Sequence, residues 1–169
     1  MKSRELGEDQ RILLSYRTAI SRNKPSAPMR HLSKENLLVG RCLDFGSGKG
    51  FDADYYGMDK YDVYYWPIWP VGKYDTIACV YVLNVLPLVA QKKVMLSILD
   101  LLKVDGNAYV TVRRDVPILG TETQSYVILN CPNIIKNKRY EIYRIGKEYK
   151  LEEMFKIGAA GNCCNGYGC

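Results

Sequence analysis

The sequence has no long hydrophobic run, and among its 169 residues there is a single histidine, His31. A helix that spans a bilayer needs about 18 or more consecutive apolar residues, so we expect no membrane-embedded segment and no membrane partner. The first nine residues are mostly charged or polar and lack the apolar stretch of a secretory signal, which predicts a cytoplasmic protein. No CxxC pair accompanies the histidine, so we predict no metal site.

The six cysteines do not indicate a disulfide framework. Cys42, Cys79 and Cys131 lie in apolar, strand-like segments, where reduced and buried thiols are the common state. The other three crowd into a Gly/Asn-rich tail at residues 158–169, which we predict to be flexible. They are Cys163, Cys164 and Cys169.

Basic residues outnumber acidic ones, and the net charge of +6 is unevenly placed. Residues 1–36 contain eight Lys or Arg against four Asp or Glu, whereas residues 37–90 contain four against six. A mildly acidic centre between basic segments is compatible with a cofactor site that has a polyanionic partner at its rim. Modest basicity is also common in proteins that bind no nucleic acid.

Strand-like and helical patterns alternate along the chain. Loosely spaced apolar residues predict an N-terminal amphipathic helix within residues 4–20. Strands are expected at residues 37–45, 56–59, 74–82 and 107–112. Pro87 is expected to begin a helix with a broad apolar face made of Val89, Val94, Leu96, Ile98, Leu99, Leu101 and Leu102. The alternation predicts an α/β fold with a mostly parallel sheet.

The C-terminal part has a different pattern. Residues 125–130 and 139–145 are predicted to form an antiparallel hairpin at the sheet edge, followed by a short helix at residues 151–157. The length of the chain is typical of one domain. We therefore expect a single domain over residues 1–157.

Three alternating glycines, Gly46, Gly48 and Gly50, follow the first predicted strand directly. Without a Cβ, this backbone can turn tightly and approach a ligand closely. Asp59 comes nine residues after Gly50 and is expected to close the next strand, where a carboxylate can accept hydrogen bonds from ribose hydroxyls. A purely structural glycine turn is the alternative.

Two common phosphate-binding motifs are absent from this region. The glycines lack GxGxxG spacing and the acid does not lie about twenty residues further on, which argues against a dinucleotide site. Lys49 is not followed by Ser or Thr, which excludes a P-loop. Asp44 and Asp52 add negative charge, so a cofactor with a ribose and an ammonium group but no phosphate fits better.

Three segments resemble motifs I, II and IV of class I methyltransferases that use S-adenosylmethionine (SAM). They are Leu43–Gly50, Gly57–Asp59 and Tyr74–Pro87, within a similarity that covers roughly residues 40–115. Residues 18–22, 26–28 and 81–85 are similar to members associated with DNA phosphorothioation, including small phage and bacterial ones. The resemblance implies a Rossmann-like sheet with helices on both faces, trimmed because too few residues separate Asp59 from Tyr74 for a full strand and helix.

The resemblance also implies how the chain is divided and where SAM binds. Residues 1–36 would form the N-terminal helix and loop, residues 37–115 the SAM-binding core, and residues 116–157 the hairpin and short helix. The implied cofactor-binding residues are Asp44, Gly46, Ser47, Gly48, Gly50, Asp59 and Asp75. Among them, the glycines would pass beneath the methionine part, Asp44 would orient its amino group and Asp59 would hold the ribose.

The methyl acceptor is less well determined. Residues 81–85 lack the Asp/Asn-Pro-Pro-Tyr/Phe box of enzymes that methylate exocyclic amines of DNA bases, and Cys79 lacks the arrangement for cytosine C5 methylation. Tyr81 and Asn84 can hydrogen-bond an acceptor beside the methyl group and are the predicted catalytic residues, with a structural role as an equal alternative.

Further residues are candidates for contacts with the acceptor. Arg22, Arg113 and Arg114 are predicted to bind it, although solvated charges or pairing with Asp115 would explain them as well. Residues 61–70 hold five aromatics and two prolines, which can stack on a base or pack against the sheet in place of a missing helix.

These features predict a SAM-dependent methyltransferase acting on a nucleic acid or nucleotide. The alternatives are a small-molecule or protein methyltransferase of the same fold and a non-catalytic module that binds SAM or a protein. Sequence specificity in so small a domain would need a homodimer or a partner subunit.

Overall fold

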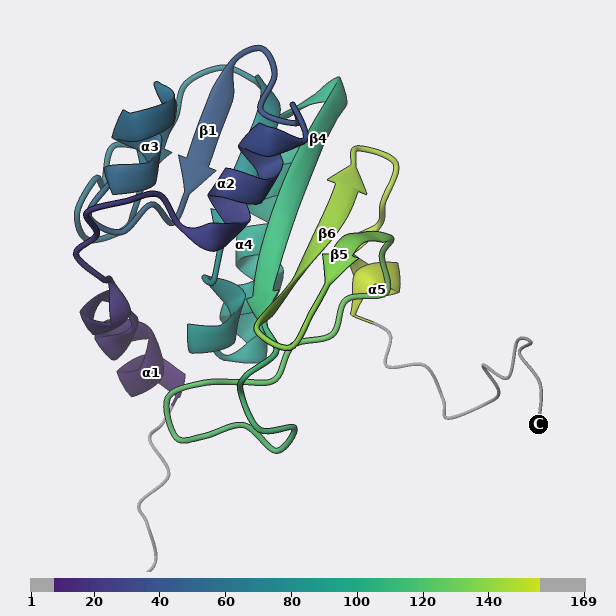
Figure 1. Ribbon diagram of the computed structural model, residues 1–169. Coiled ribbons are helices and arrows are strands. Elements are labelled where there is room, and N and C mark those ends of the chain that lie inside the picture. Colours follow the sequence, from purple (N-terminus) through teal and green to yellow (C-terminus); the bar gives the residue numbers. More distant parts are fainter. Residues whose placement is uncertain (1–7, 156–169) are drawn as a thin grey trace, which may run out of the picture.

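A mixed sheet forms the centre of the protein in a computed structural model, which describes residues 8–155 (Figure 1). Its strand order is β2-β1-β3-β4-β6-β5. The bounds are β1 (Cys42–Phe45), β2 (Asp59–Tyr61), β3 (Tyr74–Val80), β4 (Leu102–Arg113), β5 (Asn133–Lys136) and β6 (Tyr140–Gly146). The first four run parallel, whereas β6 is antiparallel to both β4 and β5. Strands β1 to β4 therefore all end at one edge of the sheet, which we call the carboxyl edge; the opposite one is the amino edge.

Helices cover both faces of this sheet, as predicted (Figure 1). α2 (Ala27–Lys34) and α3 (Phe51–Tyr56) pack on one face, where Met29, Leu32 and Ala53 meet Ala78 and Ile142. α4 (Leu88–Leu101) and α5 (Leu151–Met154) pack on the other face, against the larger part of the core. Because both faces are covered, the central strand β3 is apolar along nearly its whole length.

The N-terminal helix takes a different position. α1 (Glu8–Ser15) and the 3₁₀ turn η1 (Tyr16–Thr18) lie beyond the carboxyl edge, beside the long connection that follows β4 (Figure 1). Arg11 Nη2 donates a hydrogen bond of 2.9 Å to Ser125 Oγ of that connection. The predicted helix at residues 4–20 is thus confirmed for its central part, and residues 4–7 lie outside the described range.

The connection between β2 and β3 contains no crossover helix. Residues 62–73 contain no helix or strand of regular length and carry the chain back to β3. The ring of Trp69 lies 5.0 Å from that of Tyr61 and 6.2 Å from that of Phe45, centroid to centroid. The aromatic segment therefore packs on the sheet where a crossover helix would lie, which was one of the two predicted possibilities.

Two predicted strands are displaced in the structure. Residue 56 still belongs to α3, which ends at Gly57 with a left-handed φ of 65°, so β2 begins only at Asp59. Residues 125–130 are irregular, and the hairpin partner of β6 is β5 at residues 133–136. Val127 and Leu129 are buried in the core all the same, because packing rather than strand pairing holds this segment.

Other predictions differ from the structure in detail. β1 is shorter than residues 37–45, and β4 extends on both sides of residues 107–112. On α4, Val89 and Leu96 were expected in the apolar face but are 53% and 51% exposed. Within residues 8–155 no helix combines the length and the apolar composition that crossing a membrane requires.

Candidate active site

The turn from β1 to α3 lies at the carboxyl edge and is built on glycines with left-handed backbones. The φ angles are 78° at Gly46, 53° at Gly48 and 85° at Gly50. A Cβ at Gly46 would lie 2.3 Å from Cγ2 of Val82, well inside contact distance. The Gly46 N–H donates a 2.7 Å hydrogen bond to the carbonyl oxygen of Tyr61, which ties the turn to the end of β2. Gly46 is therefore required both by its backbone angle and by the space available.

Asp44 precedes this turn and is one of the few buried carboxylates of the protein. Its side chain is 4% exposed, and no described residue donates a hydrogen bond to it. Burial raises its pKa to about 8, the negative charges of Asp52 and Asp62 contribute, and Arg22 opposes them. A buried carboxylate without a donor is unfavourable, so this position suits a ligand that brings a cation.

Residues 19–22 cover the glycine turn. Cβ of Ala19 lies 3.2 Å from where a Cβ would stand on Gly48, and Lys49 Nζ donates a 2.6 Å hydrogen bond to Ser21 Oγ. Beneath this cover, the Oγ of Ser47 is buried and has no hydrogen-bond partner among the described residues. The site thus contains an unpaired hydroxyl as well as an unpaired carboxylate, and both are available to a bound molecule.

Asp62 is the acid that follows β2 at the carboxyl edge. Its Oδ2 accepts a 3.0 Å hydrogen bond from the N–H of Gly48, and its Oδ1 accepts bonds of 2.9 and 3.0 Å from the N–H groups of Tyr64 and Tyr65. The sequence reasoning missed this residue because β2 was expected too early in the chain. Gly57, a typical helix-ending glycine, was the signal that could have located β2 correctly.

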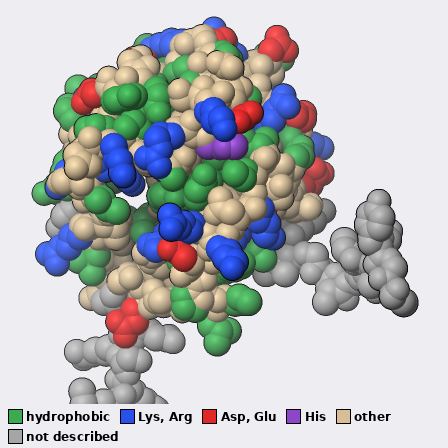
Figure 2. All heavy atoms as spheres, in the orientation of Figure 1, with side chains coloured by type: hydrophobic (Ala, Val, Ile, Leu, Met, Phe, Trp, Pro, Cys, Tyr) green, Lys and Arg blue, Asp and Glu red, His purple; other side chains and the backbone are tan. Residues whose placement is uncertain are grey.

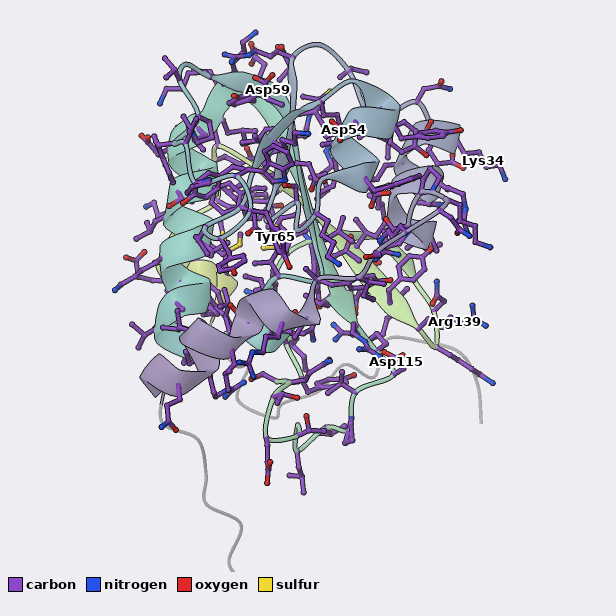
Figure 3. The ribbon with its side chains drawn as sticks, turned by 90° about the vertical axis from the view of Figure 1, so that its left-hand side faces the viewer. Lys34, Asp54, Asp59, Tyr65, Asp115 and Arg139 are labelled. Atoms are coloured by element: carbon purple, nitrogen blue, oxygen red, sulfur yellow. The ribbon has the colours of Figure 1, made fainter. Side chains whose placement is uncertain are left out.

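Asp59 and Asp75 were predicted to bind the cofactor, but both lie at the amino edge. Asp59 opens β2 and accepts hydrogen bonds from Arg41 Nη2 (2.7 Å) and Tyr74 Oη (2.8 Å). The carboxylate of Asp75 accepts 2.8 Å bonds from Lys103 Nζ, which lower its pKa. Figure 3 shows Asp59 at one end of the sheet and Asp115, which follows β4, at the other. The assignment of these two acids to the cofactor site was therefore wrong.

Tyr81 follows β3 at the carboxyl edge and has an unusual backbone. Its φ of 63° is left-handed, which is costly for a bulky side chain and is found mainly where function constrains the chain. Burial raises the pKa of its hydroxyl to about 12, and Tyr140 contributes to the rise. Arg22 and Arg113 act on the same hydroxyl in the opposite direction. Three residues predicted separately for the acceptor site are thus neighbours.

Asn84 was predicted to be catalytic, but in the structure its side chain connects two backbone segments through hydrogen bonds. The residue is fully buried, its Nδ2 donates to the Ser125 carbonyl at 2.8 Å, and its Oδ1 accepts from the Arg113 N–H at 2.7 Å. Both ends of the amide are occupied by backbone groups. The catalytic assignment of Asn84 is therefore replaced by a positioning role.

The two neighbouring arginines differ in their surroundings. Arg114 is 5% exposed and forms a 2.7 Å ion pair with the equally buried Glu141, so its predicted contact with the acceptor was wrong. Arg113 stays at the carboxyl edge, where its guanidinium donates two 2.8 Å hydrogen bonds to Asp115. Arg113 is the last residue of β4 and Arg114 follows it, so consecutive side chains of an extended backbone point in opposite directions.

No cluster of three or more His, Cys, Asp or Glu side chains suited to a metal ion occurs between residues 8 and 155. Cys42, Cys79 and Cys131 are free thiols, of which Cys79 alone is fully buried. The predicted flexible tail, with the other three cysteines, lies outside the described residues.

The strand order, the antiparallel β6 and the glycine turn after β1 describe a Rossmann-like sheet, as in methyltransferase structures that the chain resembles in fold. Crystal structures of such enzymes resemble the chain, among them the SAM-dependent methyltransferase SibL in its apo form, with a TM-score of 0.52 at 9% identity. That match covers 70% of this chain, which spans only 53% of SibL. Magnesium protoporphyrin IX methyltransferase (ChlM) from Synechocystis PCC 6803 with bound S-adenosylhomocysteine (SAH) follows, with a TM-score of 0.47 at 13% identity over 78% of this chain and 92% of ChlM.

A third structure, the DhpI–SAM–HEP complex, has a TM-score of 0.43 at 13% identity over 86% of this chain and 85% of DhpI. No model of a known protein family matches the sequence, and no curated protein does. At these identities the likeness is one of fold.

Proposed function

We propose that this chain is a SAM-dependent methyltransferase. The observation that carries the proposal is the buried, unpaired carboxylate of Asp44 beside the glycine turn, on a methyltransferase fold. SAM combines an ammonium group and a positively charged sulfonium with a ribose, and it supplies an activated methyl group. A site that concentrates three carboxylates next to a close backbone turn fits that chemistry better than it fits a phosphate.

Each part of the site has a role in this proposal. Asp44 accepts the ammonium group, the Ser47 hydroxyl gains its missing partner, and the backbone at Gly46, Gly48 and Gly50 lies under the ligand. Asp62 takes the ribose in place of Asp59, because it is the acid that touches the glycine turn. Its Oδ2 accepts one hydrogen bond and keeps a lone pair for a second.

Methyl transfer from a sulfonium is a displacement that needs alignment and exclusion of water more than a strong base. Arg22 acts electrostatically on both Asp44 and Tyr81, and we propose that Tyr81 and Arg22 align the acceptor beside the cofactor. With its pKa raised to about 12, the Tyr81 hydroxyl stays protonated near neutral pH, so it donates or accepts a hydrogen bond and does not act as a base. Arg113, held by Asp115, borders the same space.

We further propose that the acceptor is a nucleic acid or nucleotide. What supports this is the concentration of positive charge at the carboxyl edge, where Arg22 has no hydrogen-bonded partner among the described residues. Transfer of labelled methyl from SAM to nucleic acid and to small-molecule fractions of a cell extract would test it. Label found only in small molecules or proteins would overturn this acceptor class while leaving the cofactor proposal intact.

The cofactor is tested by calorimetric titration of the purified protein with SAM and SAH. We expect a dissociation constant in the micromolar range for the wild type. The Asp44→Asn and Asp62→Asn variants should bind with affinity reduced by about tenfold or more, since each loses one charge-assisted contact. Asp59→Asn is the matched control, because it changes the same group at the amino edge and should leave affinity within about twofold.

Three results would contradict the proposal. Folded wild-type protein that binds neither SAM nor SAH would overturn the methyltransferase function. Loss of binding in Asp59→Asn with binding retained in Asp62→Asn would overturn the assignment of the ribose to Asp62. Binding retained in Asp44→Asn would show that the buried carboxylate does not meet the ammonium group.

A further inference from the structure

Basic side chains approach the mouth of the candidate site from two separate parts of the chain. Residues 10–34 contain six Lys or Arg and no Asp or Glu. The last residue of β5, Lys136, and the turn to β6 with Lys138 and Arg139 lie close to the end of β4, because Tyr140 pairs with Arg113. Figure 2 shows Lys and Arg side chains around a hollow below α2, on the face where these two segments meet.

Most of this charge is not neutralised by neighbouring acids. Lys24, Lys138 and Arg139 are exposed, and none of them forms an ion pair with an acidic side chain of residues 8–155. One acid near this surface is Asp115, which lies beside Arg139 in Figure 3. Arg113 binds Asp115 directly and is the main cause of its lowered pKa, with a small further effect from Arg139. The rim therefore keeps a net positive charge.

Two tyrosines lie at the carboxyl edge, Tyr81 directly after β3 and Tyr140 directly after Arg139 at the start of β6. The hydroxyl of Tyr81 is influenced by Tyr140, which begins β6, and by Arg22, which belongs to the N-terminal segment. The side chain of Tyr81 is half-buried. An aromatic ring near basic side chains can stack on one unpaired base of a nucleic acid, while the phosphates on either side of that base contact the basic side chains.

We infer that the surface formed by Arg22, Lys24, Arg30, Lys138 and Arg139 binds the sugar-phosphate backbone of a single-stranded nucleic acid and directs one base towards Tyr81. This inference rests on the proposed function and names the physical form of its acceptor. A single strand fits because the target base must reach the carboxyl edge, behind the rim, and a base in a duplex would first have to leave its stack. Between its strands, the described part of the chain contains no inserted domain that could bind a duplex.

The variant that tests the surface is Lys138→Glu/Arg139→Glu, and the matched control is Lys92→Glu/Lys93→Glu on α4. All four side chains are exposed, and α4 covers the other face of the sheet from α2. The probe is a fluorescein-labelled mixed-sequence DNA single strand of about 20 nucleotides, and an RNA strand and a DNA duplex of the same sequence are used for comparison. Binding is measured by fluorescence anisotropy from low to moderate salt.

For the surface variant we expect about a tenfold or greater loss of affinity for the single strands at low salt. Its plot of log affinity against log salt should be shallower by about 1 to 1.5, since each lost phosphate contact removes about 0.7 from the slope. The control should bind within about twofold of wild type. The DNA and RNA arms identify which single strand is preferred, and either preference supports the surface.

Titration with SAH separates the failure of this inference from that of the proposed function. If both variants bind SAH like wild type and the surface variant also binds the single strands like wild type, the surface is overturned and the cofactor proposal stands. Equal loss in both variants would also overturn it, because it would indicate attraction by net charge alone. A clear preference for the duplex would overturn the single-strand form, and an absence of SAH binding would overturn the proposed function itself.

Discussion

Two buried acids illustrate how single residues differ between structural and functional positions. Glu141 is 3% exposed, and its carboxylate accepts hydrogen bonds from Arg114 Nε (2.7 Å) and Asn133 Nδ2 (2.9 Å). Asp44 is buried to the same degree without any such donor. A buried acid that the protein itself pairs keeps its charge, whereas one left without a donor keeps its proton until a cationic ligand arrives, and therefore indicates a ligand.

The raised pKa of Asp44 predicts a pH-dependent stability of the free protein. In the native state Asp44 holds its proton up to about pH 8, whereas in the unfolded chain it loses it near 3.8. The native state therefore binds more protons between these values, and its stability falls as pH rises from about 4 to about 8. Asp44→Asn, which cannot ionise, should be nearly as stable as wild type near pH 4 and more stable by about 1.4 kcal/mol for each pH unit above that, reaching about 5 kcal/mol near pH 8, by urea unfolding.

The same variant should lose SAM binding, so a gain in stability and a loss of affinity are expected together. If Asp44→Asn were less stable than wild type at every pH, Asp44 would be a satisfied structural residue, and its place in the cofactor site would be contradicted.

The neighbouring arginines provide a second residue-level prediction. Arg114→Met removes the closest cation of the buried Glu141, leaving only Lys136 at 3.8 Å, and should cost about 3 to 5 kcal/mol in unfolding free energy. Arg113→Met removes a pair with side chains 37% and 45% exposed and should cost about 1 kcal/mol or less. Urea unfolding of both variants and of Arg114→Met/Glu141→Gln measures this, and the double variant should recover part of the loss. Equal costs at the two positions would contradict the assignment of Arg114 to the core.

At the scale of elements, the turn between β1 and α3 holds the site together. It bonds to the end of β2 through the Tyr61 carbonyl and Asp62, and Val82 after β3 packs against Gly46. Three strand ends therefore meet at one point of the carboxyl edge. A change in this turn should affect the site before it affects the rest of the sheet.

Two glycines with similar backbone angles allow the cost of backbone strain to be distinguished from the cost of a steric clash. Gly46 lies in this turn, and Gly57 ends α3. Gly46→Ala adds a Cβ 2.3 Å from Val82 Cγ2, whereas at Gly57, with a φ of 65°, no atom lies within 4 Å of the added Cβ. We expect Gly57→Ala to cost about 1 kcal/mol and Gly46→Ala about 2 to 4 kcal/mol with weaker SAH binding. Thermal unfolding and calorimetry measure these effects.

Val82→Ala is the control for this comparison, because removing Cγ2 removes the contact. In the Gly46→Ala background it should restore part of the lost stability. No recovery in the double variant would mean that backbone strain alone accounts for the cost at Gly46.

At the scale of the whole molecule, the sheet joins two layers of helices through a continuous core. Trp66 and Trp69 are the two tryptophans of the sequence and both lie in the segment after β2, near one edge of the sheet. Tryptophan fluorescence therefore reports on that edge, whereas far-ultraviolet circular dichroism reports on all elements.

If residues 1–157 form one cooperative domain, urea unfolding followed by the two signals should give coincident transitions. SAH at about 100 times its dissociation constant should shift both transitions to higher urea concentration by the same amount, which corresponds to a gain of about 2.7 kcal/mol in unfolding free energy. Separate transitions would contradict the single domain and would indicate that the trimmed edge unfolds on its own.

The sequence alone determined the class of fold and the location of the glycine turn. Apolar strands alternating with amphipathic helices predicted the parallel sheet, and the antiparallel β6 at residues 140–146 was predicted nearly to the residue. Gly46, Gly48 and Gly50 follow β1 as expected, because their spacing reflects a local backbone requirement. Such features depend on neighbours in the chain, so a pattern of a few residues is enough to predict them.

Tertiary structure decided which charged side chains share the site. A shift of three residues in the start of β2 moved Asp59 to the amino edge and left Asp62 at the carboxyl edge. Arg114 is buried against Glu141, whereas the preceding Arg113 stays at the surface with Asp115. Ala19 lies close to Gly48, and Arg22 acts electrostatically on Tyr81, although these segments are about 30 to 60 residues apart in the chain. Composition and spacing cannot predict such contacts, because they depend on how the packed layers fit together across the sheet.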